Sequence, residues 1–446
     1  MARQLFGTDG IRGRAGHFLS AELALGVARA AVSHSPAERP QVLIVRDTRE
    51  SGEMLESALA AGVSAGGGDA LLGGVLPTPA APLLVRRHGF DLAAVISASH
   101  NPYEDNGIKL FAADGFKLGD DTEHEIEAEL GKPLAPPERI GRVRRFHGAL
   151  EDYVRELHVR FADLDLSGVR VLLDCANGAT FRAAPEAFRR LNAHVTVLAD
   201  EPDGRNINEG CGSTHLDLVR EEMARGEYDV AFAFDGDGDR VLAIDRLGAV
   251  VDGDELVALA AIHLRDLGRL PGGGVAVTVM TNYGFHQAMA AAGVEVATTP
   301  VGDRYVLDEL RRRGWALGGE QSGHIIDLGF GPSGDGIASA LLALEALRGR
   351  GLEQRDAMVR LPQRLVNVRA ADRAALAGAM SDPDVCGAIE REHDALTGRG
   401  RVLVRASGTE PLIRVMVEAP GEKETEEVCS RLVDAVQRAL GDSAHG

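Results

Sequence analysis

Three aspartates separated by single glycines carry the clearest chemistry in the sequence. Residues 235–240 read DGDGDR and directly follow the apolar, strand-like run at 229–234. Glycine permits a tight backbone path, so the carboxylates of Asp235, Asp237 and Asp239 can converge on one hard cation. Three carboxylates leave coordination positions open for a phosphate oxygen, which suits Mg²⁺ in phosphoryl transfer. An EF-hand loop and a solvated acidic turn are the alternatives, but apolar runs flank this loop and the final Glu of an EF-hand is missing.

A serine loop follows another apolar run. Residues 96–102 read ISASHNP, and residues 106–109 read NGIK. We expect the serine side chains to be exposed on a turn, where Ser99 can act as a nucleophile or a phosphate carrier beside His100. Lys109 is a candidate general acid or base, or a phosphate contact. The same sequence is also good turn chemistry, and an isolated lysine is usually a surface charge, so this loop alone leaves both interpretations open.

Two glycine-bearing loops lie further along the chain. Residues 299–305 read TPVGDRY, and residues 318–324 read GGEQSGH. Their polar groups can bond sugar hydroxyls: Glu320 accepts hydrogen bonds, Ser322 donates or accepts them, and His324 transfers protons near neutral pH. Taken singly, each of these residues is better explained as a satisfied turn residue.

A fourth loop joins two strand-like runs near the C-terminus. Residues 405–414 read RASGTEPLIR. Backbone N–H groups, the hydroxyls of Ser407 and Thr409, and the guanidinium groups of Arg405 and Arg414 can together bind a phosphate. A plain β-turn is the alternative, and it does not account for two arginines flanking the hydroxyls.

Three segments that would position these loops share one pattern: an apolar, β-branched run, a turn and an amphipathic helical stretch. The runs lie at residues 42–45, 169–173 and 275–279. Short apolar runs followed by helices are typical of buried strands in α/β units. The pattern predicts three successive α/β domains of similar build, at residues 1–150, 151–250 and 251–365.

The C-terminal part has a different pattern. Short runs at 365–368, 401–405 and 413–418 accompany a helical stretch at 422–440. This arrangement predicts a small α+β domain with an antiparallel sheet, at residues 366–446.

Composition limits the classes of function. The 446 residues are too many for one core, and 48 Lys and Arg against 67 Asp and Glu give a net charge of −19. A chain this acidic is a poor candidate for nonspecific binding to nucleic acid or anionic membranes, so an anionic substrate would need cationic residues gathered in one cleft. The four cysteines show no CxxC pair or zinc spacing, which indicates reduced thiols. With no signal-peptide pattern and no membrane-length apolar run, we expect a soluble, cytoplasmic protein.

Taken together, the four loops resemble one family, the α-D-phosphohexomutases. In chain order they are similar to its phosphoserine loop, metal loop, sugar-recognition loop and phosphate-binding loop. The resemblance begins at residues 6–13, which read FGTDGIRG, and extends to the loop at 405–414. Residues 319–324 resemble the subgroup that acts on glucosamine phosphate, whereas phosphomannomutase/phosphoglucomutase relatives typically carry Met in place of Gln321.

The resemblance implies four domains, three similar mixed α/β domains followed by a smaller α+β domain, around a central cleft. It implies that Ser99 carries the transferable phosphoryl group. It also implies that one Mg²⁺ per active site is bound by the Ser99 phosphate together with Asp235, Asp237 and Asp239. Charge stabilisation and catalysis fall to Arg12, His100, Lys109, Arg240 and His324, with Lys109 and His324 as the candidates for proton transfer. Substrate binding falls to Arg304, Glu320, Ser322, Arg405, Ser407, Gly408, Thr409 and Arg414.

The implied reaction is the reversible conversion of glucosamine 6-phosphate to glucosamine 1-phosphate. It passes through a phosphoserine enzyme and a hexose 1,6-bisphosphate that is both intermediate and activator, and it supplies UDP-N-acetylglucosamine for cell-wall synthesis. The implied partner is a small hexosamine phosphate, with no nucleic acid and no membrane, and a dimer is the expected oligomer. A phosphomannomutase or phosphoglucomutase, and a catalytically silent homologue that binds sugar phosphates, remain the alternatives.

Overall fold

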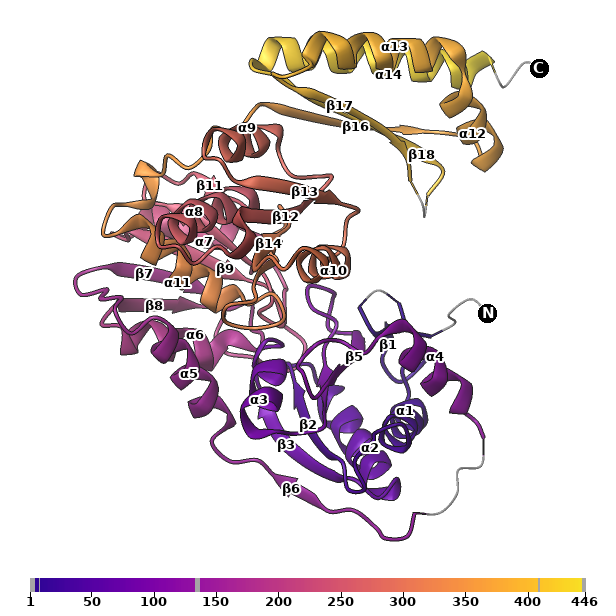
Figure 1. Cartoon of the computed structure of the whole chain (residues 1–446), viewed down its shortest axis with the longest axis vertical. Helices are drawn as coiled ribbons and strands as arrows, with labels where there is room; N and C mark the ends of the chain where they lie inside the picture. Colours follow the sequence, from indigo (N-terminus) through magenta and orange to yellow (C-terminus); the bar gives the residue numbers. More distant parts are fainter. Residues whose placement is uncertain (1–4, 8, 133–136, 408–409, 443–446) are drawn as a thin grey trace. The chain divides into compact units, whose positions relative to one another are not determined.

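The computed structural model describes residues 5–7, 9–132, 137–407 and 410–442. Tertiary contacts divide the chain into two units. The first comprises Met1–Val279 and Val294–Arg355, and the second comprises Met280–Gly293 and Asp356–Gly446. In the part of the chain that the structure describes, the first unit carries three β-sheets and the second carries one (Figure 1). Among the described residues, no helix combines the length and the apolar character needed to cross a membrane.

The first sheet has six strands in the order β1-β5-β4-β2-β3-β6. Its strands are β1 (Ile11–Arg14), β2 (Gln41–Arg46), β3 (Asp69–Val75), β4 (Leu92–Ile96), β5 (Asp105–Ala112) and β6 (Val143–Arg145). Its helices are α1 (Ala21–Ser33), α2 (Gly52–Ala65), α3 (Ala80–His88) and α4 (Asp120–Glu129). In Figure 1, α1 and α2 lie on one side of this sheet and α3 lies on the other. Because β2 and β4 are parallel neighbours that end paired at Arg46 and Ile96, the loops that follow them start side by side.

The second sheet has five strands in the order β11-β10-β9-β7-β8. Its strands are β7 (Arg170–Asp174), β8 (His194–Leu198), β9 (Val230–Phe234), β10 (Val241–Asp245) and β11 (Val250–Val251). The accompanying helices are α5 (Ala149–Arg160), α6 (Thr180–Arg190) and α7 (Asp217–Arg225). Strand β9 is buried along its whole length, and β10 returns antiparallel to it with Val241 opposite Phe234. The DGDGDR segment is therefore the connection between two adjacent strands.

The third sheet has four strands in the order β13-β12-β14-β15. Its strands are β12 (Gly274–Thr278), β13 (Glu295–Thr299), β14 (Leu317–Gly319) and β15 (Ile325–Asp327). Its helical elements are α8 (Gly253–Asp266), α10 (Asp303–Arg313), α11 (Gly336–Leu347) and the 3₁₀ turns η1 (Pro271–Gly273) and η2 (Leu352–Gln354). Strands β14 and β15 are antiparallel, so the segment that holds residues 320–324 is the turn between them.

The second unit is built on an antiparallel sheet of three strands in the order β16-β18-β17. Its elements are β16 (Gln363–Arg369), β17 (Arg401–Ala406), β18 (Leu412–Glu418), α9 (Tyr283–Ala291), α12 (Arg373–Ser381), α13 (Pro383–Leu396) and α14 (Glu422–Asp442). Apolar side chains of α12, α13 and α14 pack with the sheet in one core. Helices α13 and α14 lie on one face of the strands (Figure 1). Helix α9 is tied to this sheet by Glu418, whose carboxylate accepts from the backbone N–H of Tyr283 at 2.8 Å.

These elements confirm the predicted fold class, since three mixed α/β sheets precede a small antiparallel sheet with its helices. The runs expected at 42–45, 169–173 and 275–279 correspond to β2, β7 and β12, and the C-terminal runs correspond to β16, β17 and β18. The domain boundaries at 150, 250 and 365 stay predictions.

Candidate active site

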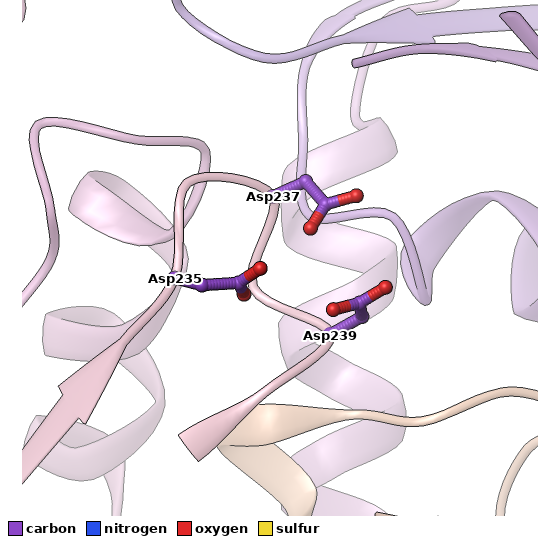
Figure 2. A group of neighbouring side chains, drawn as sticks. All are labelled: Asp235, Asp237 and Asp239. Atoms are coloured by element: carbon purple, nitrogen blue, oxygen red, sulfur yellow. The ribbon is translucent and has the colours of Figure 1, made fainter. Parts of the chain in front are cut away.

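The three aspartates of the loop between β9 and β10 lie close together. One carboxylate oxygen of each of Asp235, Asp237 and Asp239 lies within 4.8 Å of the other two, and all three residues are buried (Figure 2). Gly238 makes the turn possible because its φ of 72° is left-handed. A side chain at Gly236 would place Cβ 2.6 Å from the Ser99 carbonyl oxygen, so that position also requires glycine.

The electrostatics of this cluster fit a divalent cation. Burial, followed by the charges of Asp239 and Asp237, raises the pKa of Asp235 well above its usual range. Burial acts in the same direction on Asp237, but the ammonium of Lys109 and the hydroxyl of Thr78 hold its pKa well below the ordinary value. One oxygen of Asp237 and one of Asp239 are buried without a hydrogen-bond partner among the described residues. Buried oxygens of this kind need a cation or a donor.

Ser99 lies beside the acidic cluster. Its Oγ donates to Oδ2 of Asp235 at 2.5 Å and lies 3.3 Å from Nδ1 of His100. The expectation that the loop's serine side chains are exposed is wrong, because Ser97 and Ser99 are both buried. The loop packs against the connection between β9 and β10, which removes it from solvent.

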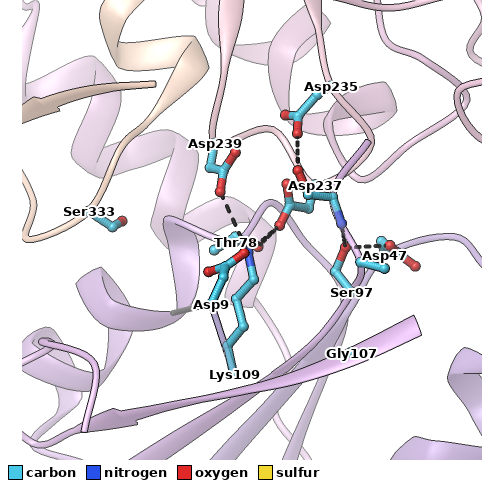
Figure 3. Close-up of polar contacts among 12 residues, drawn as sticks. Asp9, Asp47, Thr78, Ser97, Gly107, Lys109, Asp235, Asp237, Asp239 and Ser333 are labelled. Atoms are coloured by element: carbon cyan, nitrogen blue, oxygen red, sulfur yellow. Dashed lines mark hydrogen bonds and ion pairs between the residues drawn. The ribbon is translucent and has the colours of Figure 1, made fainter. Parts of the chain in front are cut away.

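Cationic side chains surround the aspartates, as an anionic substrate requires. Lys109 projects from β5, and its Nζ lies 2.9 Å from Asp237 Oδ2 and 3.6 Å from Asp239 Oδ2 (Figure 3). Burial disfavours the ammonium, but the two carboxylates outweigh that effect and raise the pKa of Lys109. Arg240 Nη1 lies 3.2 Å from His100 Nδ1, and burial together with Arg240 lowers the pKa of that histidine. Arg12, from β1, pairs with Asp9.

A pocket adjoins this cluster. The described residues that line it include three predicted catalytic side chains, two predicted sugar-binding side chains, one aspartate of the acidic cluster and two further acids: Arg12, Arg240, His324, Glu320, Ser322, Asp239, Asp9 and Asp303. Glu320 accepts a hydrogen bond from the backbone N–H of Gly302 at 3.0 Å, which joins the two glycine-bearing loops. His324 Nε2 lies 3.9 Å from both Asp239 and Asp303, and its buried Nδ1 has no hydrogen-bond partner among the described residues.

The structure brings in residues that the sequence interpretation missed. Lys117 Nζ lies 2.6 Å from Asp9 Oδ1 and 2.7 Å from Asp303 Oδ2. Thr78 Oγ1 donates to Asp237 Oδ2 at 2.6 Å. Asp9 and Asp303 stand in the motifs already recognised and could have been found there, whereas Lys117 and Thr78 carry no sequence signal of their own.

Two predicted residues point elsewhere. Arg304 forms ion pairs with Asp120 and Glu123 of α4, and it is not among the described residues that line the pocket. Gln321, which marked the subgroup, donates its amide to Asp252 at 3.2 Å, and Asp252 is the N-cap of α8. Neither side chain is therefore placed for direct contact with a ligand in this pocket.

The predicted phosphate-binding loop lies in the second unit. Arg405 and Arg414 are directly paired across β17 and β18. The backbone N–H of Ser407 donates to the Leu412 carbonyl at 2.8 Å. Gly408 and Thr409 lie outside the described residues, as does Thr8 of the N-terminal motif.

Comparison with known proteins gives matches to four domains of the phosphoglucomutase/phosphomannomutase family. The alpha/beta/alpha domains I, II and III match residues 3–135, 151–248 and 252–365, and the C-terminal domain matches residues 365–435. A phosphoglucosamine mutase from Moorella thermoacetica is 50% identical over 442 residues, which cover 96% of this chain and 98% of the relative. Other curated relatives, down to 44% identity over nearly the full length, carry the same name.

Solved structures share the fold. A phosphoglucomutase/phosphomannomutase family protein from Burkholderia thailandensis has a TM-score of 0.82 at 24% identity, covering 99% of this chain and 98% of that one. The N-acetylphosphoglucosamine mutase of Aspergillus fumigatus, solved with GlcNAc-6P and magnesium, has a TM-score of 0.64 at 18% identity, covering 98% and 96%. The four domain matches and the full-length relatives show that the chain belongs to the phosphoglucosamine mutase branch of the phosphoglucomutase/phosphomannomutase (α-D-phosphohexomutase) family and is an intramolecular phosphotransferase of the isomerase class.

Proposed function

We propose that this enzyme interconverts glucosamine 6-phosphate and glucosamine 1-phosphate through a phosphoserine at Ser99 and a hexosamine 1,6-bisphosphate intermediate. The observation that carries the proposal is the position of the Ser99 hydroxyl, 2.5 Å from Asp235 within the acidic cluster. A phosphate on that oxygen would lie beside three carboxylates, which repel it unless a cation is bound, and beside the Lys109 ammonium. The names of the full-length relatives support the amino sugar as substrate.

Asp235, Asp237 and Asp239 would hold one Mg²⁺ together with the phosphate on Ser99. When bound, Mg²⁺ supplies charge neutralisation at the transferring phosphoryl group. The buried, unpartnered oxygens of Asp237 and Asp239 support this assignment, because oxygen ligands are those that Mg²⁺ prefers.

In the transfer, the bond between phosphorus and Ser99 Oγ breaks and a bond to the free sugar hydroxyl forms. Arg12, Lys109 and Arg240 stabilise the negative charge on the phosphoryl oxygens. The sugar hydroxyl loses a proton and the departing Ser99 oxygen gains one, so the transfer needs both an acceptor and a donor. We assign the acceptor to His324 and the donor to Lys109, because Lys109 is an ammonium bonded to Asp237 and its pKa is raised.

The second half of the reaction reverses the roles of the two phosphates. The bisphosphate turns end for end, and its other phosphoryl group returns to Ser99. Glu320 and Ser322 bind the sugar hydroxyls in both orientations. The phosphate that is not reacting is bound by the second-unit loop, through Arg405, Ser407, Gly408, Thr409 and Arg414. Arg304 contributes indirectly, by joining α10 to α4. We expect the enzyme to act as a cytoplasmic dimer and to supply UDP-N-acetylglucosamine for cell-wall precursors.

A coupled assay tests the substrate. With Mg²⁺ and a trace of hexose 1,6-bisphosphate present, kcat/KM is compared for glucosamine 6-phosphate, glucose 6-phosphate and mannose 6-phosphate. A strong preference for the amino sugar supports the proposal, whereas a preference for glucose or mannose phosphate indicates a phosphoglucomutase or phosphomannomutase. Intact-mass analysis that finds no phosphate on Ser99, with no turnover of any substrate, indicates a silent homologue.

A further inference from the structure

We infer that Arg49 is a positioning residue for phosphoryl transfer, because its guanidinium fixes the backbone that aims Ser99 at the metal loop. The inference rests on the proposed role of Ser99 as the phosphoryl carrier. It adds a residue from the loop between β2 and α2, which none of the four sequence motifs includes. Arg49 is an arginine with no exposed side-chain surface.

The guanidinium of Arg49 uses all five of its N–H donors. Four of them bond to backbone carbonyls of the serine loop and of the first residue of β5. Nη2 donates to the carbonyls of Ser99 and Asn101, both at 2.9 Å. Nη1 donates to the carbonyls of Pro102 and Asp105, the latter at 2.9 Å. A single side chain therefore holds four carbonyls of the segment that carries the nucleophile.

The fifth donor connects Arg49 to a second route toward Ser99. Its Nε donates to Oδ2 of Asp47 at 2.9 Å. The same oxygen accepts the hydroxyl of Ser97 at 2.5 Å, and the Ser97 oxygen in turn accepts the backbone N–H of Ser99 at 3.0 Å (Figure 3). Arg49 and Asp47 thus fix both the amide and the carbonyl of Ser99. Parallel pairing of β2 with β4 makes this possible by starting the two loops side by side.

The second sheet completes the arrangement around Ser99. Nδ2 of Asn208 donates to the Ser99 carbonyl at 3.0 Å and to the Asn101 carbonyl at 3.2 Å. The Ser99 carbonyl therefore has two donors, one from each side of the boundary between the first and second sheets. These bonds hold Ser99 at a φ of 53°, a left-handed conformation that non-glycine residues adopt at an energetic cost.

This backbone geometry decides where the reacting oxygen lies. With the amide and the carbonyl of Ser99 both fixed, Oγ points at Asp235. Lysine at position 49 would keep one positive charge but has only three donors and no planar fork. Such a change would release some of the four carbonyls without removing the charge. It therefore separates the geometric role of Arg49 from an electrostatic one.

The test compares Arg49→Lys with the wild-type enzyme and with a matched control, Arg160→Lys. Arg160 is a half-buried arginine at the end of α5 that pairs with Glu345 and Asp327 outside the site. Each protein is phosphorylated with glucose 1,6-bisphosphate, and the phosphate on Ser99 is quantified by intact mass. Rapid-quench single turnover with glucosamine 6-phosphate then gives the transfer rate, at a temperature well below the Tm of each variant, and steady-state assays give KM.

We expect Arg49→Lys to lower the transfer rate about 100-fold, because a displacement of roughly 1 Å at the reacting atom costs about that factor. KM should change little, and Arg160→Lys should transfer at the wild-type rate even if its Tm falls. If Arg49→Lys does not fold, Ser97→Ala and Asn208→Ala replace it. Each removes one bond to the Ser99 backbone, and each should lower the transfer rate about tenfold, the factor that corresponds to about 1.4 kcal/mol.

Wild-type transfer by folded Arg49→Lys, or by both smaller variants, overturns the inference and leaves the proposed function intact. An equal loss in Arg160→Lys also overturns it, because the effect would then be general destabilisation. Absence of phosphate from Ser99 of the wild-type enzyme overturns the proposed function, and the inference with it.

Discussion

Nζ of Lys117 lies 2.7 Å from Oδ2 of Asp303. This ion pair joins the segment before α4 to the first turn of α10. The same ammonium also bonds Asp9. Burial alone would raise the pKa of Asp303, but Lys117, followed by His324, holds it well below the ordinary range. One cation thus connects the N-terminal motif with the loop that precedes α10, and both flank the pocket.

Replacing Lys117 should weaken both folding and catalysis. Lys117→Met leaves the carboxylates of Asp9 and Asp303 without their shared cation, so we expect a loss of about 1–2 kcal/mol in the free energy of unfolding. We also expect kcat/KM to fall about tenfold, because the groups around the pocket lose their spacing. Urea unfolding and the coupled assay measure the two effects. Lys132→Met, at an exposed ion pair, is the matched control and should stay within about 0.5 kcal/mol of wild type.

Ser99→Ala should abolish normal turnover, because it removes the oxygen proposed to carry the phosphoryl group. The substitution removes one buried hydroxyl, so the fold should persist, and circular dichroism checks that it does. The measurements are kcat with glucosamine 6-phosphate and the mass of the protein after incubation with glucose 1,6-bisphosphate. Activity close to that of wild type would rule out the phosphoserine mechanism.

Asp237→Ala should weaken Mg²⁺ binding more than tenfold, because it removes one of the three carboxylates proposed to bind the ion. It also removes the carboxylate that lies 2.9 Å from the buried Lys109 ammonium, so a lower Tm should accompany the loss. Titration calorimetry with Mg²⁺ gives the affinity, with Asp217→Ala on the exposed surface of α7 as the control. Equal affinities in the two variants would contradict the assignment of the metal to this loop.

Gln321→Met should change substrate selectivity little. The Gln321 amide bonds to Asp252 at the N-cap of α8, so the substitution removes a structural hydrogen bond worth about 1 kcal/mol. We expect the ratio of kcat/KM for glucosamine 6-phosphate to that for glucose 6-phosphate to stay within about threefold of wild type. This change is smaller than the one expected from losing a direct hydrogen bond to the substrate. Ser322→Ala, within the pocket lining, should change it more. A reversal of preference in Gln321→Met would show that this position does select the sugar.

The pH dependence of stability should report on Asp335. Burial raises its pKa to about 6, against the effect of the bonds it accepts from Ala338 N–H and the Tyr153 hydroxyl. Because the folded pKa lies above the unfolded value, this group favours folding most at low pH, and the contribution is lost as pH rises from about 4 to about 6. The shift corresponds to about 3 kcal/mol. Asp335→Asn removes this titration. The difference in unfolding free energy between wild type and variant, measured in urea, should therefore shift by about 2 kcal/mol in favour of wild type between pH 7 and pH 4, since the unfolded carboxyl is itself partly protonated at pH 4. A difference that does not change with pH would contradict the raised pKa.

Local sequence predicts most of the elements and the acidic loop, because both depend on short-range patterns. The alternating glycines and aspartates identify the acidic loop at residues 235–240 without any knowledge of the fold, and an apolar run such as 229–234 indicates a buried strand. Each of the four loops is likewise a short, continuous stretch of sequence. The serine loop and the glycine-bearing loops do not indicate their chemistry singly, and their roles follow only from the resemblance of the four loops together to one family.

The missed features all depend on contacts between distant parts of the chain. Lys117 meets Asp303 from 186 positions away, so nothing beside it in the sequence indicates a functional role. Arg49 is buried only because the loops after β2 and β4 start together. The serine loop has a sequence typical of an exposed turn, but packing against the acidic loop at residues 235–240 buries it. For Arg304 and Gln321 the prediction rests on motif membership, which fixes a position in the chain and not the direction of a side chain.

Helix α9 belongs to the second unit, although β12 and β13 of the first unit flank it in the chain. The polypeptide therefore crosses between the units three times, after residues 279, 293 and 355. A fragment that starts at residue 366 would lack α9 and leave the buried Glu418 without its partners at Asn282 and Tyr283. Exchange of the C-terminal domain between members of this family would thus require two separate stretches of sequence to be transplanted. One stretch holds the second unit's sheet and the other holds α9, and both must come from the same protein.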